Sequence, residues 1–231
     1  SFGVLLAALG VMLVTRTPAP VLPAFLPMVV LALVLTHGFT SLLLGFQASQ
    51  LQHPTLSLLA GAYAFLGILE LCQLMATPGA VSINGLTGSP QDAAWFGVVA
   101  NFGFPILALV AVFQLQHKRS LLTLWASWLV PSIAALTAAA VIVSFDDLPA
   151  LVVNNRLTYV LSNILAPAQM GLYSVALLAL MLGTHLRTRL HLWLAVALLA
   201  TLAGVATGVS AGERFTVGWY AGRGLTLMSS A

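Results

Sequence analysis

The sequence predicts an all-α, polytopic integral membrane bundle of about eight transmembrane helices, with both termini on the cytoplasmic side. Hydrophobic residues make up 60% of the 231 residues and charged residues only 6%, against about 25% charged residues in a typical soluble domain. The mean hydropathy of +1.04 leaves too little polar surface to coat a water-soluble globule. The apolar residues also gather in runs that are separated by short polar or proline-rich joints.

A membrane-spanning helix needs roughly 20 apolar residues, and each apolar run of about this length is predicted to form one helix. In chain order the runs are 1–14, 24–46, 55–76, 94–115, 121–144, 158–183, 190–210 and 217–231. The first and last runs are too short to span alone. We therefore expect residues 1–231 to form one membrane-embedded domain that is truncated at both ends.

Basic residues set the predicted orientation. The joints 116–119 and 184–189 hold four of the eight lysines and arginines. They are two joints apart, so they lie on the same side, and the positive-inside rule makes that side cytoplasmic. The longer loops 77–93 and 145–157 are then outside. A formal net charge of +3 is too sparse for a nucleic-acid interface, so the expected partner is the lipid bilayer.

Polar side chains at membrane depth are costly and mark candidate sites. Glu70 and Gln73 share a face of the third run because they are three residues apart. His37 lies in the second run and Asn101 in the fourth. One hypothesis is that these four residues converge on an internal cavity that binds a ligand, a proton or a metal. The alternative is a set of inter-helix hydrogen bonds, which contribute on average about 0.6 kcal/mol each in membranes.

The sequence predicts neither a metal site nor a catalytic site. Of the five histidines, only His37 lies at depth, and no pair has the i, i+4 spacing of a helical metal site. Residues 208–212 match the G-x-S-x-G pattern of hydrolases, but they end a membrane helix instead of joining a strand to a helix. We therefore expect no enzymatic activity in this part of the chain, and its cofactors stay unknown.

Small residues recur every four positions along the seventh run, at Ala200, Gly204, Gly208 and Gly212. Such a stripe lets helix backbones approach closely. The stripe predicts tight packing of this helix against a neighbour, either in the same chain or in a second copy.

The most distinctive segment is 213–223, where Arg214 and Arg223 lie nine residues apart around an aromatic and glycine core. Trp219 and Tyr220 are typical anchors at a membrane interface, and with Arg214 and Arg223 they are further candidates for ligand binding or signal sensing. Arg223, deeper in the helix, should contact a carboxylate, helix-end carbonyls or an anionic ligand; alternatively, it snorkels and only sets the depth of the helix. A Glu70–Arg223 contact, direct or through a ligand, is one further prediction.

The motif RFTVGWYAGR at 214–223 resembles the hallmark of the fourth class of bacterial membrane-associated sensor (MASE) domains. Further matches, in the same order and spacing over nearly all 231 residues, are segments 25–27, 42–47, 78–80, 91–95, 103–105 and 190–194. The resemblance implies an eight-helix input module in the bacterial cytoplasmic membrane. It also implies a homodimer with a fused output domain, most often a GGDEF diguanylate cyclase that makes cyclic di-GMP and sometimes a histidine kinase.

The chain departs from this family pattern at polar positions. Gln73 and Asn101 stand where the pattern has histidines, and His37 aligns with an acidic residue. If the family histidines bind metal or haem, this chain does not bind them in the same way.

Three functions follow from these observations. The first is a sensory input domain, in which a small-molecule or lipid signal shifts helix packing and the last helix relays the shift. The second is a membrane-anchoring and dimerising module without a ligand. The third is a small-molecule transporter, although the sequence lacks the inverted repeats that many carriers show.

Overall fold

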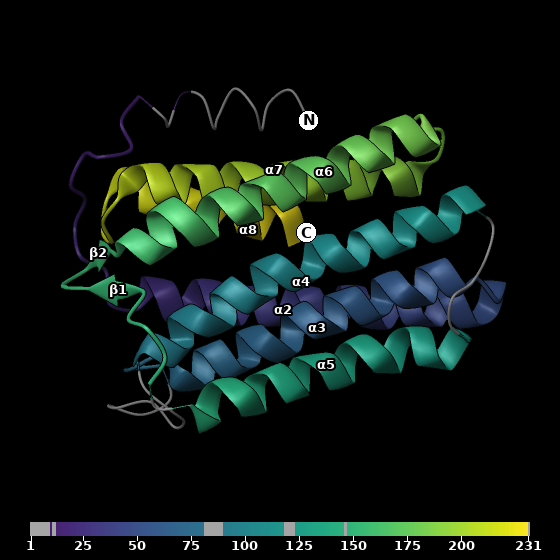
Figure 1. The fold of residues 1–231 in the computed structure, drawn as a ribbon, viewed down its shortest axis with the longest axis horizontal. Helices are drawn as coiled ribbons and strands as arrows, with labels where there is room; N and C mark the ends of the chain where they lie inside the picture. Colours follow the sequence, from purple (N-terminus) through teal and green to yellow (C-terminus); the bar gives the residue numbers. More distant parts are fainter. Residues whose placement is uncertain (1–9, 11–12, 81–89, 118–122, 146, 231) are drawn as a thin grey trace.

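The computed structural model is an all-α bundle in which helices consecutive in the chain run antiparallel (Figure 1), and it describes residues 10, 13–80, 90–117, 123–145 and 147–230. Its elements are α2 (Phe25–Leu51), α3 (Pro54–Ala76), α4 (Pro90–His117), α5 (Leu124–Ser144), β1 (Val152–Val153), β2 (Arg156–Leu157), the π-helix η1 (Val160–Leu165), α6 (Ala166–Thr184), α7 (Arg189–Ala211) and α8 (Val217–Ser230). Five of the eight predicted runs agree with α2, α3, α4, α5 and α7 to within a few residues. The run 158–183 corresponds to η1 followed directly by α6.

Six helices in the described residues are long and apolar enough to cross a membrane: α2, α3, α4, α5, the continuous η1–α6 helix and α7. Most of the predicted run 1–14 lies outside the described residues. The run 217–231 corresponds to α8, whose 14 residues measure about 21 Å at 1.5 Å per residue. This length is shorter than the roughly 30 Å hydrocarbon core. The prediction of a membrane-spanning helical bundle is therefore confirmed, but the predicted number of eight spans is not.

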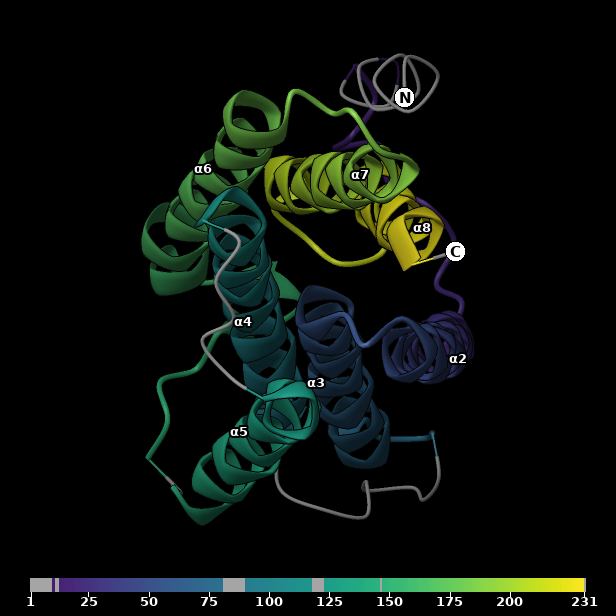
Figure 2. The ribbon, with the colours of Figure 1, turned by 90° about the vertical axis from the view of Figure 1, so that its right-hand side faces the viewer.

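The helices form two layers (Figure 2). In the α2–α5 layer, α3 packs against α2, α4 and α5. Of the residues in its most apolar stretch, 67% are buried, so α3 is the central helix of this layer. In the α6–α8 layer, α7 packs against α6 and α8. The two layers touch mainly along two edges, where α4 meets α6 and where α2 meets α8. A site can lie between the layers, away from these two contacts.

Prolines interrupt the hydrogen bonding of the helices next to that space. Pro105 lies inside α4, so the carbonyl of Asn101, four residues earlier, has no proline N–H to accept from. Pro167 follows η1 at the start of α6. The π-helix η1 ends just before this proline, and π-helical turns are frequently found at functional sites.

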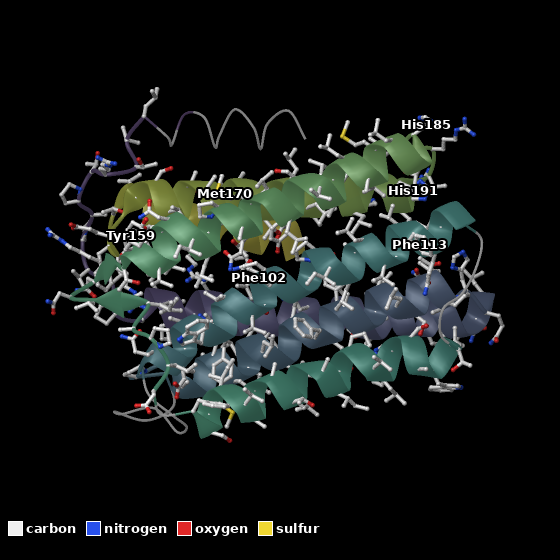
Figure 3. The ribbon with its side chains drawn as sticks, in the orientation of Figure 1. Phe102, Phe113, Tyr159, Met170, His185 and His191 are labelled. Carbon is white, nitrogen blue, oxygen red and sulfur yellow. The ribbon has the colours of Figure 1, made fainter. Side chains whose placement is uncertain are left out.

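The two ends of the bundle differ in chemistry. One end carries the β1–β2 hairpin, whose turn residues Asn154 and Asn155 both have positive φ, a conformation that asparagine tolerates better than most residues. We call it the hairpin end. The other end, called the basic end, carries the C-terminus of α4 and the α6–α7 joint 185–188 (Figure 1). Figure 3 shows His185 and His191 at the basic end and Tyr159 near the hairpin end. The two basic joints were predicted to share a side, and the helices that lead into them end together. That this side is cytoplasmic stays a prediction.

Residues 15–22, which lead into α2, pair with the turn between α7 and α8. We call this pairing of residues 15–22 with 212–220 the terminal seam. Its backbone hydrogen bonds join Val217 N–H to Thr17 C=O (3.0 Å), Gly218 N–H to Thr15 C=O (3.0 Å) and Ala19 N–H to Phe215 C=O (2.9 Å). Gly218 is required here, because a Cβ on it would lie 2.7 Å from the Cβ of Thr15. The same turn bonds to the hairpin, since Arg214 N–H donates to Asn155 C=O at 2.8 Å.

The stripe of small residues on α7 faces α8 of the same chain. A Cβ on Gly204 would lie 2.9 Å from the Gly222 carbonyl oxygen, and a Cβ on Gly222 would lie 2.8 Å from the Gly204 carbonyl oxygen. Gly208 differs, because no atom lies within 4 Å of its Cβ position. Gly212 ends α7 with a φ of 72°. Close packing therefore depends on Gly204 and Gly222, while Gly208 borders open space.

Candidate functional site

A buried pair of titratable side chains joins α2 to α3. His37 Nδ1 and Glu70 Oε2 are 2.6 Å apart, and the two residues are 3% and 6% exposed. His37 reaches α3 because it lies on the same buried face of α2 as Ser41, which donates to the Ala60 carbonyl at 2.8 Å. The contact is an ion pair when the imidazole is protonated and the carboxylate is ionised; in the other states it is a hydrogen bond whose donor depends on the imidazole tautomer and on the carboxyl proton. The described residues contain no Glu70–Arg223 ion pair, so the direct form of the predicted contact is wrong, and the Glu70 carboxylate bonds to His37. Contact through a ligand stays a prediction.

A small cavity of about 50 Å³, called the inner cavity, lies beside this pair. The structure brings all four polar residues predicted to converge into its lining: His37, Glu70, Gln73 and Asn101. Arg223 lines the same cavity from α8. Arg223 is therefore close to Glu70 without bonding to it, and the remaining gap is large enough for a few water molecules.

A larger cavity of about 150 Å³, called the outer cavity, extends from there toward the hairpin end. It shares the lining residues Gln73, Asn101 and Arg223 with the inner cavity, so the two cavities are adjacent. Its walls come from both layers: α3 and α4 on one side, and η1, α6, α7 and α8 on the other. The glycines of these helices, Gly97, Gly204, Gly208 and Gly222, make part of its lining. The polar site is therefore built at the contact between the two layers.

Two arginines face the outer cavity. Arg223 comes from α8 and Arg214 from the α7–α8 turn. Burial lowers the pKa of the Arg214 guanidinium, but arginine stays positively charged at neutral pH. Glu213, next to Arg214, pairs instead with Arg156 at 2.7 Å on the surface. Within the described residues, neither Arg214 nor Arg223 has a side-chain hydrogen bond or an ion pair.

Trp219 and Tyr220 hold the start of α8 against the start of α2. The indole of Trp219 is buried and its ring centroid lies 5.8 Å from that of Phe25. The Tyr220 hydroxyl donates to the Pro20 carbonyl at 2.7 Å and accepts from Leu22 N–H at 3.2 Å. The sequence predicted membrane-interface anchors. In the structure these aromatic side chains also join one part of the protein to another, because residues 15–22 fold back over them, and Trp219 lines the outer cavity. Their contact with the membrane interface stays a prediction.

The sequence that folds into this bundle matches one family model, described as "Membrane-associated sensor, integral membrane domain" (MASE4), over residues 20–231. The chain belongs to the MASE4 family. It is thus a multi-pass membrane sensor domain, and the domain is sensory and not catalytic. No curated protein and no solved structure matches the chain.

Three hydroxyl side chains of this MASE4 domain were missed by the sequence analysis. Thr226 lines both cavities, and Thr201 and Ser229 line the inner cavity, where their hydroxyls are 3.0 Å apart. Arg223, Thr226 and Ser229 follow one another at three-residue spacing on α8. Such spacing places them on one face of a helix, so this signal was present in the sequence.

The residues that the MASE4 domain offers to a metal are few. His37 and Glu70 are the titratable metal-ligand types in the inner cavity, and the described part of the chain contains no group of three histidine, cysteine or acidic side chains that could hold an ion. Gln73 and Asn101 contribute amides. Tyr173 donates to the Asn101 side-chain oxygen over 3.4 Å. The lining is therefore better equipped for hydrogen bonding than for metal coordination.

Proposed function

We propose that this MASE4 domain is a ligand-responsive input module in which α8 relays the occupancy of the two cavities to a cytoplasmic effector. The effector follows residue 231 and is a diguanylate cyclase that makes cyclic di-GMP or, as the second choice, a histidine kinase. The protein is a homodimer in the bacterial cytoplasmic membrane. The ligand-contacting residues are Glu70, Gln73, His37, Asn101, Arg223 and Arg214, with Trp219 and Tyr220 holding α8 in place.

The observation that carries this proposal is the position of Arg223 and Thr226. Both lie on α8 and line both cavities, while the opposite walls belong to α3 and α4. A ligand that contacts α8 and the α2–α5 layer together changes the relative stability of the positions that α8 can take. A ligand shifts such an equilibrium only through its different affinity for the two states.

The direction of α8 supports the relay. The helix starts at the hairpin end, where the terminal seam anchors it, and runs toward the basic end (Figure 1). The basic end is the predicted cytoplasmic side. A change in the rotation or tilt of α8 about its anchored start is thus directed toward the effector.

A helical-phase experiment on the full-length protein tests the relay. Inserting one to four alanines after α8 rotates the effector by about 100° per residue, whereas inserting seven alanines nearly restores the original phase. We expect the output, measured as cyclic di-GMP formation or autophosphorylation, to change with the phase and to recover with seven residues.

An output that is insensitive to all insertions would contradict the relay. The same result would favour the ligand-free anchoring module, in which α8 only tethers the effector. A second arm replaces residues 1–231 with an unrelated dimeric membrane anchor. If the output and its phase dependence were unchanged, the sensor proposal would be wrong.

A further inference from the structure

We propose that the outer cavity is a binding site for a small oxyanion, a carboxylate or phosphate group, held by Arg214 and Arg223. This inference rests on the proposed function and names the chemical class of its signal. It starts from a charge imbalance in the cavity lining. Among the described residues, the outer cavity is lined by two arginines and by no aspartate or glutamate.

The charge of Arg223 is only partly balanced from elsewhere. Its guanidinium is repelled by Arg214 and attracted by Glu70. The Glu70 carboxylate, however, is already bonded to His37 at 2.6 Å. An unpaired cation inside an apolar bundle is unfavourable unless an anion or an acceptor accompanies it. A bound oxyanion between Arg214 and Arg223 would reduce the repulsion between the two guanidinium groups and supply the missing negative charge.

The chemistry of the two side chains selects an oxyanion in particular. A guanidinium presents planar, paired N–H donors that match the oxygens of a carboxylate or phosphate. Chloride and other monatomic ions cannot use this paired geometry. Gln73 and Asn101 add amide groups at the junction with the inner cavity, where they can bond a second polar group of the ligand.

The size of the cavity limits the ligand. A volume of about 150 Å³ equals that of a protein cavity known to hold benzene, which has six carbon atoms. The free space exists because glycines line it, and at Gly208 no atom lies within 4 Å of the Cβ position. The outer cavity therefore accepts an anion of about six non-hydrogen atoms, or the phosphate head of a lipid whose chains stay outside.

The test measures binding in the protein itself, independently of any effector output. The protein is purified in dodecyl maltoside micelles, which contain no phosphate, and its thermal unfolding is followed against increasing propionate or inorganic phosphate, with chloride keeping the ionic strength constant. We expect a saturable rise of the unfolding midpoint with at least one probe. Parallel micelles that contain phosphatidylglycerol distinguish a lipid phosphate from a free anion, because a bound lipid raises the midpoint without any added probe.

Variants locate the site. Arg223→Met should weaken binding about ten- to a hundredfold, as expected for lost charge-assisted hydrogen bonds. Arg223→Lys keeps the charge but loses the paired donors, and should weaken binding about tenfold. Gly208→Leu fills the cavity without changing any charge and should abolish binding. Arg187→Met removes an exposed charge at the basic end and should bind like the parent protein.

Two results would overturn the assignment. The first is the absence of a saturable shift with propionate, phosphate and phosphatidylglycerol in a parent protein that unfolds cooperatively. The second is an equal shift in Arg187→Met, Arg223→Met and Gly208→Leu, which would indicate a general salt effect. Neither result bears on the helical-phase experiment, so failure of the anion site and failure of the α8 relay can be told apart.

Discussion

The buried His37–Glu70 pair allows a quantitative prediction about the free energy of unfolding of the bundle. Replacing His37 with leucine leaves the Glu70 carboxylate buried without its partner. Breaking a buried pair in this way destabilises proteins by about 3–5 kcal/mol. Hydrogen bonds in membranes are worth less, about 0.6 kcal/mol on average and 1.7 kcal/mol at most. We therefore expect His37→Leu to lower the free energy of unfolding by about 3 kcal/mol, near the lower end of the range for buried pairs.

Replacing both residues should cost less than the two single changes added together. In His37→Leu/Glu70→Leu no charge or lone acceptor remains, and the leucines keep most of the side-chain volume. Apolar replacement of a complete buried pair is often close to neutral, so the coupling free energy should exceed about 1 kcal/mol. Glu70→Gln keeps an oxygen that accepts from the imidazole, and it should be milder than Glu70→Leu.

The assay is reversible unfolding in detergent micelles, with all variants measured under one condition. Ser41→Ala combined with Glu70→Leu is the matched control. Ser41 lies on the same face of α2 as His37, but it bonds to Ala60, about 15 Å along α3 from Glu70 at 1.5 Å per residue. The control pair should be additive to within about 0.5 kcal/mol. If the His37–Glu70 pair were equally additive, the two side chains would not act as a unit and the reasoning would be wrong.

Three further outcomes follow from the packing of α7 and α8 and from the ends of the bundle. Gly204→Ala should lower the free energy of unfolding by about 1–3 kcal/mol because its Cβ meets the facing backbone of α8, whereas Gly208→Ala should not lower it; equal losses would mean that the glycines pack alike. In a cysteine-free background, a cysteine at Asp147 should react with an impermeant thiol reagent in intact cells and one at Arg187 should not, and the opposite pattern would reverse the orientation. Tyr220→Phe removes the hydroxyl bonds of the terminal seam and should cost about 0.5–1.5 kcal/mol in unfolding free energy; an unchanged value would show that the seam does not depend on them.

The sequence predicts the helices well because each span is defined by a local property, the length of its apolar run. It also identifies His37, Glu70, Gln73 and Asn101, since any polar group at membrane depth is unfavourable without a partner. Which of these side chains bond to each other cannot be predicted in the same way. Which carboxylate meets which cation depends on how each helix is rotated and which helices are neighbours, and these are properties of the packed bundle.

For this reason the sequence predicts a direct contact of Arg223 with Glu70, whereas Glu70 bonds to His37 and Arg223 only lines the same cavity. The two layers explain the difference: α2 packs directly on α3, while α8 reaches the site from the other layer. The terminal seam could not be predicted from the sequence either. Residues 15–22 read as a proline-rich joint, and nothing local indicates that their backbone would bond to a turn near residue 216.

The terminal seam has a consequence for how the protein is made. Its Tyr220–Pro20 hydrogen bond joins residues that are 200 positions apart, so it cannot form until nearly the whole domain has been synthesised and inserted. Contacts with such long sequence separation form late, because the chain between them must be ordered first. The start of α8 is therefore among the last parts of the bundle to take its final place. During biogenesis, the helix proposed to carry the signal can be anchored only after every preceding membrane segment has been synthesised.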